Sequence, residues 1–324
     1  VARRRAARLF DLVAGFSYSQ VLLATVESGL CEVLESGPVG VDQIAAKTGL
    51  STDAALRLVR AAAALDLAEA VGADHWMLGQ QGAALLGSPG AQAMISHHRL
   101  LYADLADPLA LLRDDRLSPT ALSDFWRYGS DSETARAYSE LMTVSQTMVA
   151  EQFLTSYPLA RHRALLDVGG GHGAFLTHVA RTAPHLRLGV FDLPAVLDTA
   201  PGLRGATRHA GDFFRDPIPT GYDCVTLIRV LHDHEDAPCL ALLRAVRAAL
   251  PPGGCLVVAE PMAGTAGVRA MGDAYFGMYL WAMRAGRPRT AREIAAMMQQ
   301  AGFRSYREHP TSLPMIARVI VAQN

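Results

Sequence analysis

The sequence has few charged residues and no excess of charge of one sign. Only 19% of its 324 residues are charged, and its 30 basic and 31 acidic side chains nearly cancel. A chain without net positive charge lacks the electrostatic field of a nucleic-acid-binding protein. Half of the residues are apolar, which indicates extensive helix packing or an interface between two copies. We therefore expect a small-molecule ligand, no nucleic acid and a homodimer.

Cysteine is also scarce, and long apolar runs are missing. The four cysteines contain no CxxC pair, so their spacing predicts neither a zinc site nor a redox couple; they are Cys31, Cys224, Cys239 and Cys255. We find no apolar run of the roughly 18 to 20 residues that a membrane span requires. These observations predict reduced cysteines, no metal and a cytoplasmic protein. The basic residues 1–10 are interpreted as a solvated helix, with peripheral contact to an anionic membrane as the alternative.

The first eighty residues follow the order of a winged-helix module. Apolar residues at helical spacing predict a helix over 16–34, followed by helices over 41–48 and 51–65 and a hairpin over 69–78. Residues 1–80 contain seven basic and nine acidic side chains, which would neutralise DNA phosphates poorly. Packing or dimerisation is the better interpretation of this module.

After Pro158, short apolar runs alternate with helical segments. This alternation is typical of a doubly wound α/β sheet. We expect a mainly helical dimerisation domain over residues 1–105 and a catalytic domain over 106–324. Within the second domain, helices over 106–157 would connect to the sheet and contribute to a substrate pocket.

A glycine-rich loop follows the first strand of the predicted sheet. Asp167-Val168 ends the strand, and five residues containing Gly169 and Gly171 let the backbone approach a ligand closely. The glycine spacing fits NAD as well as S-adenosylmethionine. Asp167 favours S-adenosylmethionine, because a carboxylate attracts the methionyl ammonium group and repels a pyrophosphate.

Two further acidic positions follow the next strands. Asp192 ends the second strand and is placed to accept hydrogen bonds from ribose hydroxyls of either cofactor. Gly211-Asp212-Phe213 offers a carboxylate for an adenine amino group and an aromatic ring for the adenine face. An ordinary capped turn with core phenylalanines is the alternative interpretation of this segment.

These motifs together resemble the small-molecule O-methyltransferases of plants and bacteria that carry an amino-terminal winged-helix dimerisation domain. The resemblance covers nearly the whole chain and implies the Rossmann-like sheet of class I methyltransferases. It is closest to the bacterial hydroxyneurosporene and demethylspheroidene O-methyltransferases, which act on acyclic carotenoids. The matching segments are DVGGGHG at 167–173, FDLP at 191–194, GDFF at 211–214, RVLHDHED at 229–236, LPPGGCLVVAEP at 250–261, and GDAYFGMYLWAMRAGRPRT at 272–290.

The resemblance implies a role for several positions. His232 takes the place of the general base, Arg229 and Leu193 lie in cofactor motifs, and Glu260 matches one of two carboxylates that bracket the base. The second carboxylate position is Pro288 here, so its contribution is missing. A neutral histidine can accept a proton at neutral pH. Alternatively, His232 is an ordinary histidine at a strand end, or it binds a metal with His234.

The acceptor pocket is expected from methionine and aromatic side chains, which form adaptable apolar walls. We place Met142, Phe276 and Met283 in this wall, with core packing as the alternative. The leading function is transfer of a methyl group from S-adenosylmethionine to a hydroxyl of a lipophilic small molecule, first an acyclic carotenoid. The alternatives are C- or N-methylation of an aromatic metabolite, a cofactor-sensing winged-helix regulator and an NAD-dependent dehydrogenase.

Overall fold

The computed structural model describes residues 2–126, 132–200 and 205–324. Contacts divide the chain into two compact units, Val1–Arg99 and Leu100–Asn324. The sequence analysis placed this boundary after residue 105. Each unit has its own hydrophobic core, so each is described by itself.

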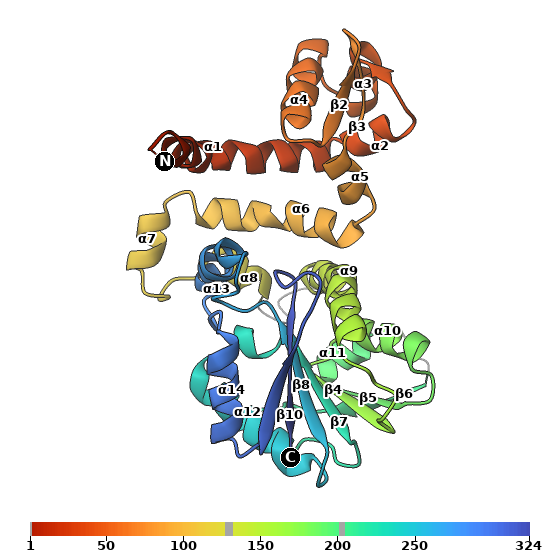
Figure 1. Cartoon of the computed structure of the whole chain (residues 1–324), viewed down its shortest axis with the longest axis vertical. Coiled ribbons are helices and arrows are strands. Elements are labelled where there is room, and N and C mark those ends of the chain that lie inside the picture. Colours follow the sequence, from red (N-terminus) through yellow and green to blue (C-terminus); the bar gives the residue numbers. More distant parts are fainter. Residues whose placement is uncertain (1, 127–131, 201–204) are drawn as a thin grey trace. The chain divides into compact units, whose positions relative to one another are not determined.

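The amino-terminal unit combines helices with a small antiparallel sheet (Figure 1). Its three strands are arranged in the order β1-β3-β2, and they pack with the helices around a core that contains Leu30, Ile44, Val59 and Trp76. The predicted winged-helix order of elements is therefore present. The elements are α1 (Ala2–Glu27), α2 (Leu30–Glu35), β1 (Val39–Gly40), α3 (Val41–Thr48), α4 (Thr52–Ala64), β2 (Ala68–Val71), β3 (His75–Leu78) and α5 (Gln80–Leu86).

The helix predicted over residues 16–34 is two helices in the structure. Gly29 has a φ of 68°, a left-handed conformation that glycine adopts without strain, and it separates α1 from α2. By contrast, the predicted start of the third helix is confirmed, because the Ser51 hydroxyl accepts a hydrogen bond from the Ala54 amide at 3.2 Å.

Helix α1 also corrects the expectation about apolar runs. Its segment Arg5–Glu27 is long and apolar enough to cross a membrane, judged by length and composition alone, and only 11% of its most apolar window is buried in the structure. Such a stretch is weak evidence for a span, because core helices and signal sequences have the same composition.

The second unit is built on a seven-stranded sheet of order β6-β5-β4-β7-β8-β10-β9. The five neighbouring strands β6, β5, β4, β7 and β8 pair in parallel. Strand β10 pairs antiparallel with both β8 and β9. This is the doubly wound sheet that the alternating pattern predicts. The strands are β4 (Ala164–Val168), β5 (Arg187–Asp192), β6 (Ala206–Ala210), β7 (Cys224–Ile228), β8 (Cys255–Glu260), β9 (Ser305–His309) and β10 (Arg318–Gln323).

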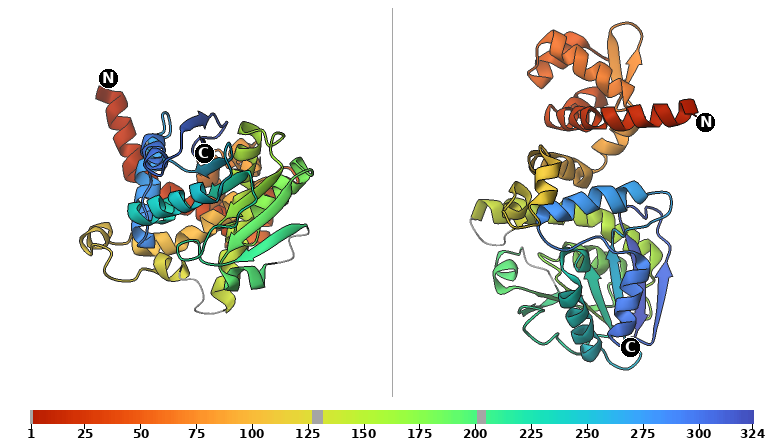
Figure 2. Two further views of the ribbon diagram at one scale, coloured as in Figure 1. Left: turned by 90° about the horizontal axis from the view of Figure 1, so that it is seen from below. Right: turned by 90° about the vertical axis from the view of Figure 1, so that its left-hand side faces the viewer.

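Helices cover both faces of this sheet (Figures 1 and 2). One core contains side chains of α12 (Asp236–Ala249) and α14 (Ala291–Gln300) packed on Leu166 and Val168 of β4. The other contains side chains of α9 (Ser132–Ser156), α10 (Ala174–Thr182) and α11 (Pro194–Thr199) packed on Leu165. Alternate residues of a strand face opposite sides, so a fully apolar strand is buried on both.

The edge strand β9 was not predicted from the sequence. Its residues Ser305–His309 are largely exposed and include only one large apolar side chain, Tyr306. An edge strand of this composition gives no alternating apolar signal, and its pairing with β10 defines it.

Helices at one end of the sheet, among them α8 and α13 (Figure 1), contribute to a further apolar cluster. Residues Ala270–Tyr275 make a π-helical turn that continues into α13 (Phe276–Met283), and α13 packs on α8 (Ala121–Trp126). This cluster joins Leu101, Leu111, Leu122, Tyr279, Leu280 and Met283. The remaining helices are α6 (Pro89–Asp104) and α7 (Pro108–Arg113).

Candidate active site

The glycine loop lies between β4 and α10, where the sequence predicted it. Gly169, Gly171 and Gly173 have φ values of 70°, 56° and 76°, which other residues rarely adopt. At Gly170 a Cβ atom would lie 2.6 Å from Asp167 Oδ2. The loop therefore turns tightly over the Asp167 carboxyl group, and only glycine permits that approach.

Asp167 is buried directly beneath this loop, with 1% of its surface exposed. Its Oδ1 accepts a hydrogen bond from the Thr226 hydroxyl at 2.7 Å, whereas Oδ2 has no hydrogen-bond partner among the described residues. Burial raises the pKa of Asp167 to about 7. A buried carboxyl oxygen without a partner fits the ammonium group of S-adenosylmethionine, which would favour the ionised form.

Asp192 lies at the carboxyl end of β5 and fixes the loop. Its Oδ2 accepts from the Gly171 amide and its Oδ1 accepts from the Leu193 amide, each at 2.7 Å. Each carboxyl oxygen keeps a second acceptor position. Burial raises the pKa of Asp192 as well. Its contact with ribose hydroxyls, and the role of Leu193 beside them, stay predictions.

The segment after β6 is both a capped turn and a neighbour of the glycine loop. Asp212 Oδ1 accepts from the Phe214 amide at 2.9 Å, which is the alternative considered from the sequence. The Gly211 amide donates to the Asp192 carbonyl at 3.0 Å. A Cβ atom at Gly169 would lie 3.5 Å from the Phe213 ring. Three strand ends thus meet, with Phe213 beside the loop.

Arg229 follows β7 in a strained conformation, with a φ of 58°. Its amide donates to the Ala259 carbonyl at 2.9 Å, and its Nη1 donates to the Ser145 hydroxyl of α9 at 3.0 Å. The guanidinium group is therefore held between the sheet edge and α9, next to His232.

His232 lies in a 3₁₀ turn, Leu231–Asp233, at the carboxyl edge of the sheet. Its Nε2 is 3.2 Å from Asp233 Oδ1, and its ring centre is 6.2 Å from that of Phe276. Burial, with the charge of Arg229 second, lowers the pKa of His232 to about 3. The imidazole is therefore neutral at pH 7 and has a lone pair available for a proton.

Asp233 and Glu260 are the two carboxyl groups next to this histidine. Burial raises the pKa of Asp233 to about 7 and that of the fully buried Glu260 to about 8. Glu260 Oε2 accepts from the backbone amide of His232 at 3.2 Å. The resemblance suggested that Glu260 orients the imidazole, but the hydrogen bond observed holds the backbone of the turn.

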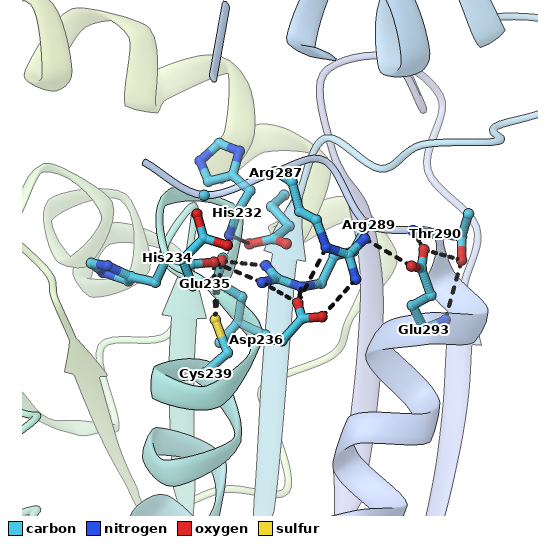
Figure 3. Close-up of polar contacts among 12 residues, drawn as sticks. His232, His234, Glu235, Asp236, Cys239, Arg287, Arg289, Thr290 and Glu293 are labelled. Carbon is cyan, nitrogen blue, oxygen red and sulfur yellow. Dashed lines mark hydrogen bonds and ion pairs between the residues drawn. The ribbon is translucent and has the colours of Figure 1, made fainter. Parts of the chain in front are cut away.

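The sequence analysis missed a buried arginine that holds the same turn. Arg289 is fully buried and donates to the carbonyls of Leu231 and His234 at 2.6 and 2.7 Å, and to Asp236 (Figure 3). The matching segment 272–290 ends in GRPRT and contains this residue, but the segment alone assigns it no partner. The arginine reaches two carbonyls because the intervening chain folds back against the turn.

The residues just before Arg289 lie directly against the backbone of the turn that carries His232. The Arg287 amide donates to the His232 carbonyl at 3.0 Å. A Cβ atom at Gly286 would lie 1.9 Å from the same carbonyl oxygen, so glycine is required there. The side chain of Arg287 pairs with Asp236 and Glu293 (Figure 3). Pro288, at the position of the missing carboxylate, thus lies in a segment held from both sides.

The three predicted pocket residues have different surroundings. Phe276 is close to His232 and begins α13. Met283 is buried in the apolar cluster with Leu280 and Tyr279, which is core packing. Met142 is half-buried on α9, three residues before the Ser145 that binds Arg229. A pocket role for Met142 and Met283 stays a prediction.

Known proteins share both units of the chain. Residues 102–304 match the O-methyltransferase domain, and residues 10–86 match the O-methyltransferase dimerisation domain. The chain therefore belongs to the O-methyltransferase family that uses S-adenosylmethionine. It is a methyltransferase with the class I fold, as the sequence analysis predicted, and neither the regulator nor the dehydrogenase alternative is favoured.

Particular relatives cover nearly the whole length. Demethylspheroidene O-methyltransferase of Cereibacter sphaeroides is 42% identical over 99% of this chain and 88% of the relative. The protein of the same name from Rhodobacter capsulatus is 44% identical over 100% of this chain and 83% of the relative. Human N-acetylserotonin methyltransferase, solved with S-adenosylmethionine, superposes with a TM-score of 0.82 at 26% identity, covering 98% of this chain and 97% of that structure.

Proposed function

We propose that this enzyme methylates a hydroxyl group of an acyclic carotenoid. The proposal rests on one structural observation, the neutral and buried His232 beside Phe276 at the carboxyl edge of the sheet. The acceptor class comes from the relatives named demethylspheroidene O-methyltransferase, which are 42% and 44% identical.

The cofactor would bind where the carboxyl ends of β4, β5 and β6 meet. When bound, S-adenosylmethionine supplies a methyl group activated by a sulfonium centre. Asp167 Oδ2 would accept from its ammonium group, Asp192 from its ribose, and Phe213 would pack on its adenine. Arg229, fixed by Ser145, would close the site beside the reacting groups.

His232 would remove the acceptor's proton. Its lowered pKa makes it a weak base, so it cannot ionise an alcohol in advance. The proton would therefore transfer as the new carbon–oxygen bond forms and the hydroxyl becomes acidic. Asp233, 3.2 Å from Nε2, would stabilise the imidazolium that results. The bond from Glu260 and the contacts of Arg289 keep the turn in place during this step.

The surroundings of the base suit an apolar acceptor. Phe276, whose ring centre is 6.2 Å from that of His232, packs with Tyr275 and Tyr279 at ring separations of 4.8 and 6.4 Å. Aromatic side chains exclude water and make favourable contacts with a flat conjugated chain. A polyene with a terminal hydroxyl matches this wall better than a charged acceptor.

The test uses labelled S-adenosylmethionine and two acceptors, a detergent-dispersed acyclic hydroxycarotenoid and a simple phenol. We expect a labelled methyl ether of the carotenoid, identified by mass spectrometry and NMR, and slower turnover of the phenol. Label attached to carbon or nitrogen would favour the alternative methyltransferase chemistry. Label on the phenol alone would show that the carotenoid assignment is wrong.

We also propose that the enzyme is a homodimer joined through its amino-terminal unit. This unit matches a dimerisation domain, and α1 exposes apolar side chains that a second copy would cover. Phe10, Leu12 and Phe16 are 71%, 79% and 73% exposed. Light scattering of the intact chain tests the dimer, and deletion of residues 1–16 should yield monomers.

We propose as well that the arginine-rich residues 1–10 contact an anionic membrane surface. A lipophilic acceptor would pass from this membrane to the enzyme. Arginine attracts anionic headgroups, and this attraction weakens as salt screens it. Flotation with anionic and zwitterionic vesicles tests the contact. Equal binding to both vesicle types would exclude the electrostatic contribution.

A further inference from the structure

A second group of reactive side chains lies at the opposite edge of the sheet from His232. One donor atom each of His162, Cys224 and Cys255 lie within 4.8 Å of one another. Cys224 and Cys255 are the first residues of β7 and β8 and pair in register, and His162 precedes β4. β7 has five residues and β8 has six, so each strand spans about 16 Å or more. The cluster is therefore separate from the methyl-transfer site.

The histidine of this cluster is oriented in the manner of a metal ligand. Its Nδ1 lies 3.6 Å from Asp223 Oδ2, and Asp223 is itself fixed by the amides of Arg163 and Ala164. Metal-binding histidines commonly direct one ring nitrogen at a carboxylate in this way, which leaves the other nitrogen free to coordinate.

The other ring nitrogen faces the sulfur atoms. His162 Nε2 lies 3.7 Å from Cys255 Sγ and 2.8 Å from the Tyr157 hydroxyl. Arg161 donates to this nitrogen at 3.4 Å and to the Tyr157 oxygen at 2.7 Å. Nε2 therefore acts as an acceptor and is the unprotonated nitrogen of the ring. The Tyr157 oxygen lies 3.3 Å from Cys255 Sγ and completes the group.

We propose that Cys224, Cys255 and His162 bind a thiophilic divalent cation, with Zn²⁺ the best fit. Two thiolates and a neutral imidazole are a ligand set that zinc favours, and the Tyr157 oxygen or a water molecule would occupy the fourth position. Bond lengths of about 2.3 Å to sulfur and about 2.0–2.1 Å to nitrogen require the donor atoms to draw together by roughly 1 Å. Both thiols lose their protons to solvent on binding, so the two negative charges balance the cation.

The surroundings support this ligand set. Cys224 is completely buried, and Cys255 and His162 are 1% and 6% exposed. A buried thiolate is costly without a compensating charge, and the cation supplies one. The site would join the segment after α9 to β7 and β8, so its effect is on the stability of the catalytic unit.

The test measures metal content and metal-dependent stability of the full chain. Cys224→Ser and Cys255→Ser each remove one ligand, and Cys31→Ser is the matched control, since Cys31 is a buried cysteine of the other unit. We expect about one zinc per wild-type chain by elemental analysis, a Co²⁺ derivative with thiolate-to-metal absorption, and a higher melting temperature with Zn²⁺ than with a chelator. All three should persist in Cys31→Ser and be lost in the other two variants.

A second measurement does not depend on the folding of a core variant. Treatment of the wild-type protein with a mercurial thiol reagent should release zinc in proportion to the modification of Cys224 and Cys255, identified by peptide mass spectrometry. The proposal is overturned if the wild-type chain binds neither Zn²⁺ nor Co²⁺, if Cys31→Ser loses metal equally, or if the aerobically purified chain contains a Cys224–Cys255 disulfide.

Discussion

Glu260 accepts a hydrogen bond from the backbone amide of His232, with 3.2 Å between Oε2 and the nitrogen. This bond joins the last residue of β8 to the turn that carries the proposed base. The Glu260 carboxyl group has a pKa of about 8 and is therefore mostly neutral at pH 7. A neutral acceptor in this place holds the turn without adding a second charge to the site.

Replacing the proposed base should abolish most of the chemistry and leave cofactor binding intact. We expect His232→Ala to lower kcat by roughly 10²–10⁴-fold, the usual contribution of a general base. Calorimetric affinity for S-adenosylmethionine should stay within a few fold of wild type. His185→Ala, an exposed histidine on the surface, is the control. Turnover near that of wild type would mean that another group accepts the proton.

The affinity for S-adenosylmethionine should increase with pH. Asp167 has a pKa of about 7 in the free enzyme, and its carboxylate is the form that binds an ammonium group. Binding should therefore tighten as pH rises from 6 to 8 and release up to one proton per site. Titration calorimetry in buffers of different ionisation enthalpy measures both quantities. Asp167→Asn should bind more weakly with a flatter pH dependence, and an unchanged slope in this variant would exclude Asp167 as the linked group.

The unfolding free energy of the cofactor-free enzyme should depend on pH through the buried Glu260. Its folded pKa of about 8 lies above its ordinary value of 4.5. The stabilisation from its protonated form is therefore complete below pH 4.5 and is lost as pH rises through about 8. Urea unfolding of wild type and Glu260→Gln from pH 5 to 9 should show the variant gaining relative stability as pH rises. Glu69→Gln, at an exposed position, is the control. Parallel curves for wild type and Glu260→Gln would contradict the shifted pKa.

Arg289 should act by positioning the turn. Arg289→Met keeps the apolar stem but leaves Asp236 and the carbonyls of Leu231 and His234 without their donor. We expect a loss of roughly 3–5 kcal/mol in unfolding free energy, typical of breaking a buried ionic contact. We also expect kcat to fall by about 10²-fold, more than KM changes, because the base is displaced. Arg292→Ala, an exposed arginine of α14, should match wild type. Equal kcat in both variants would show that Arg289 has no positioning role.

Local patterns in the sequence determined much of the fold and the cofactor loop. The apolar run 164–168, the glycines after it and Asp192 twenty-odd residues later lie where their chemistry predicted, because a strand, a sharp turn and a helix start depend on neighbouring residues. The break at Gly29 and the exposed edge strand Ser305–His309 were missed, since each depends on packing or on a pairing partner.

Only the tertiary structure decided which distant groups meet. Arg289 contacts carbonyls of residues 231 and 234, and no local pattern signals a guanidinium that binds backbone more than fifty residues away. The four cysteines have no metal-binding spacing in the sequence, yet two of them lie beside His162. They meet because parallel strands align their amino ends on one edge, just as their carboxyl ends bring Asp167, Asp192 and His232 together on the other.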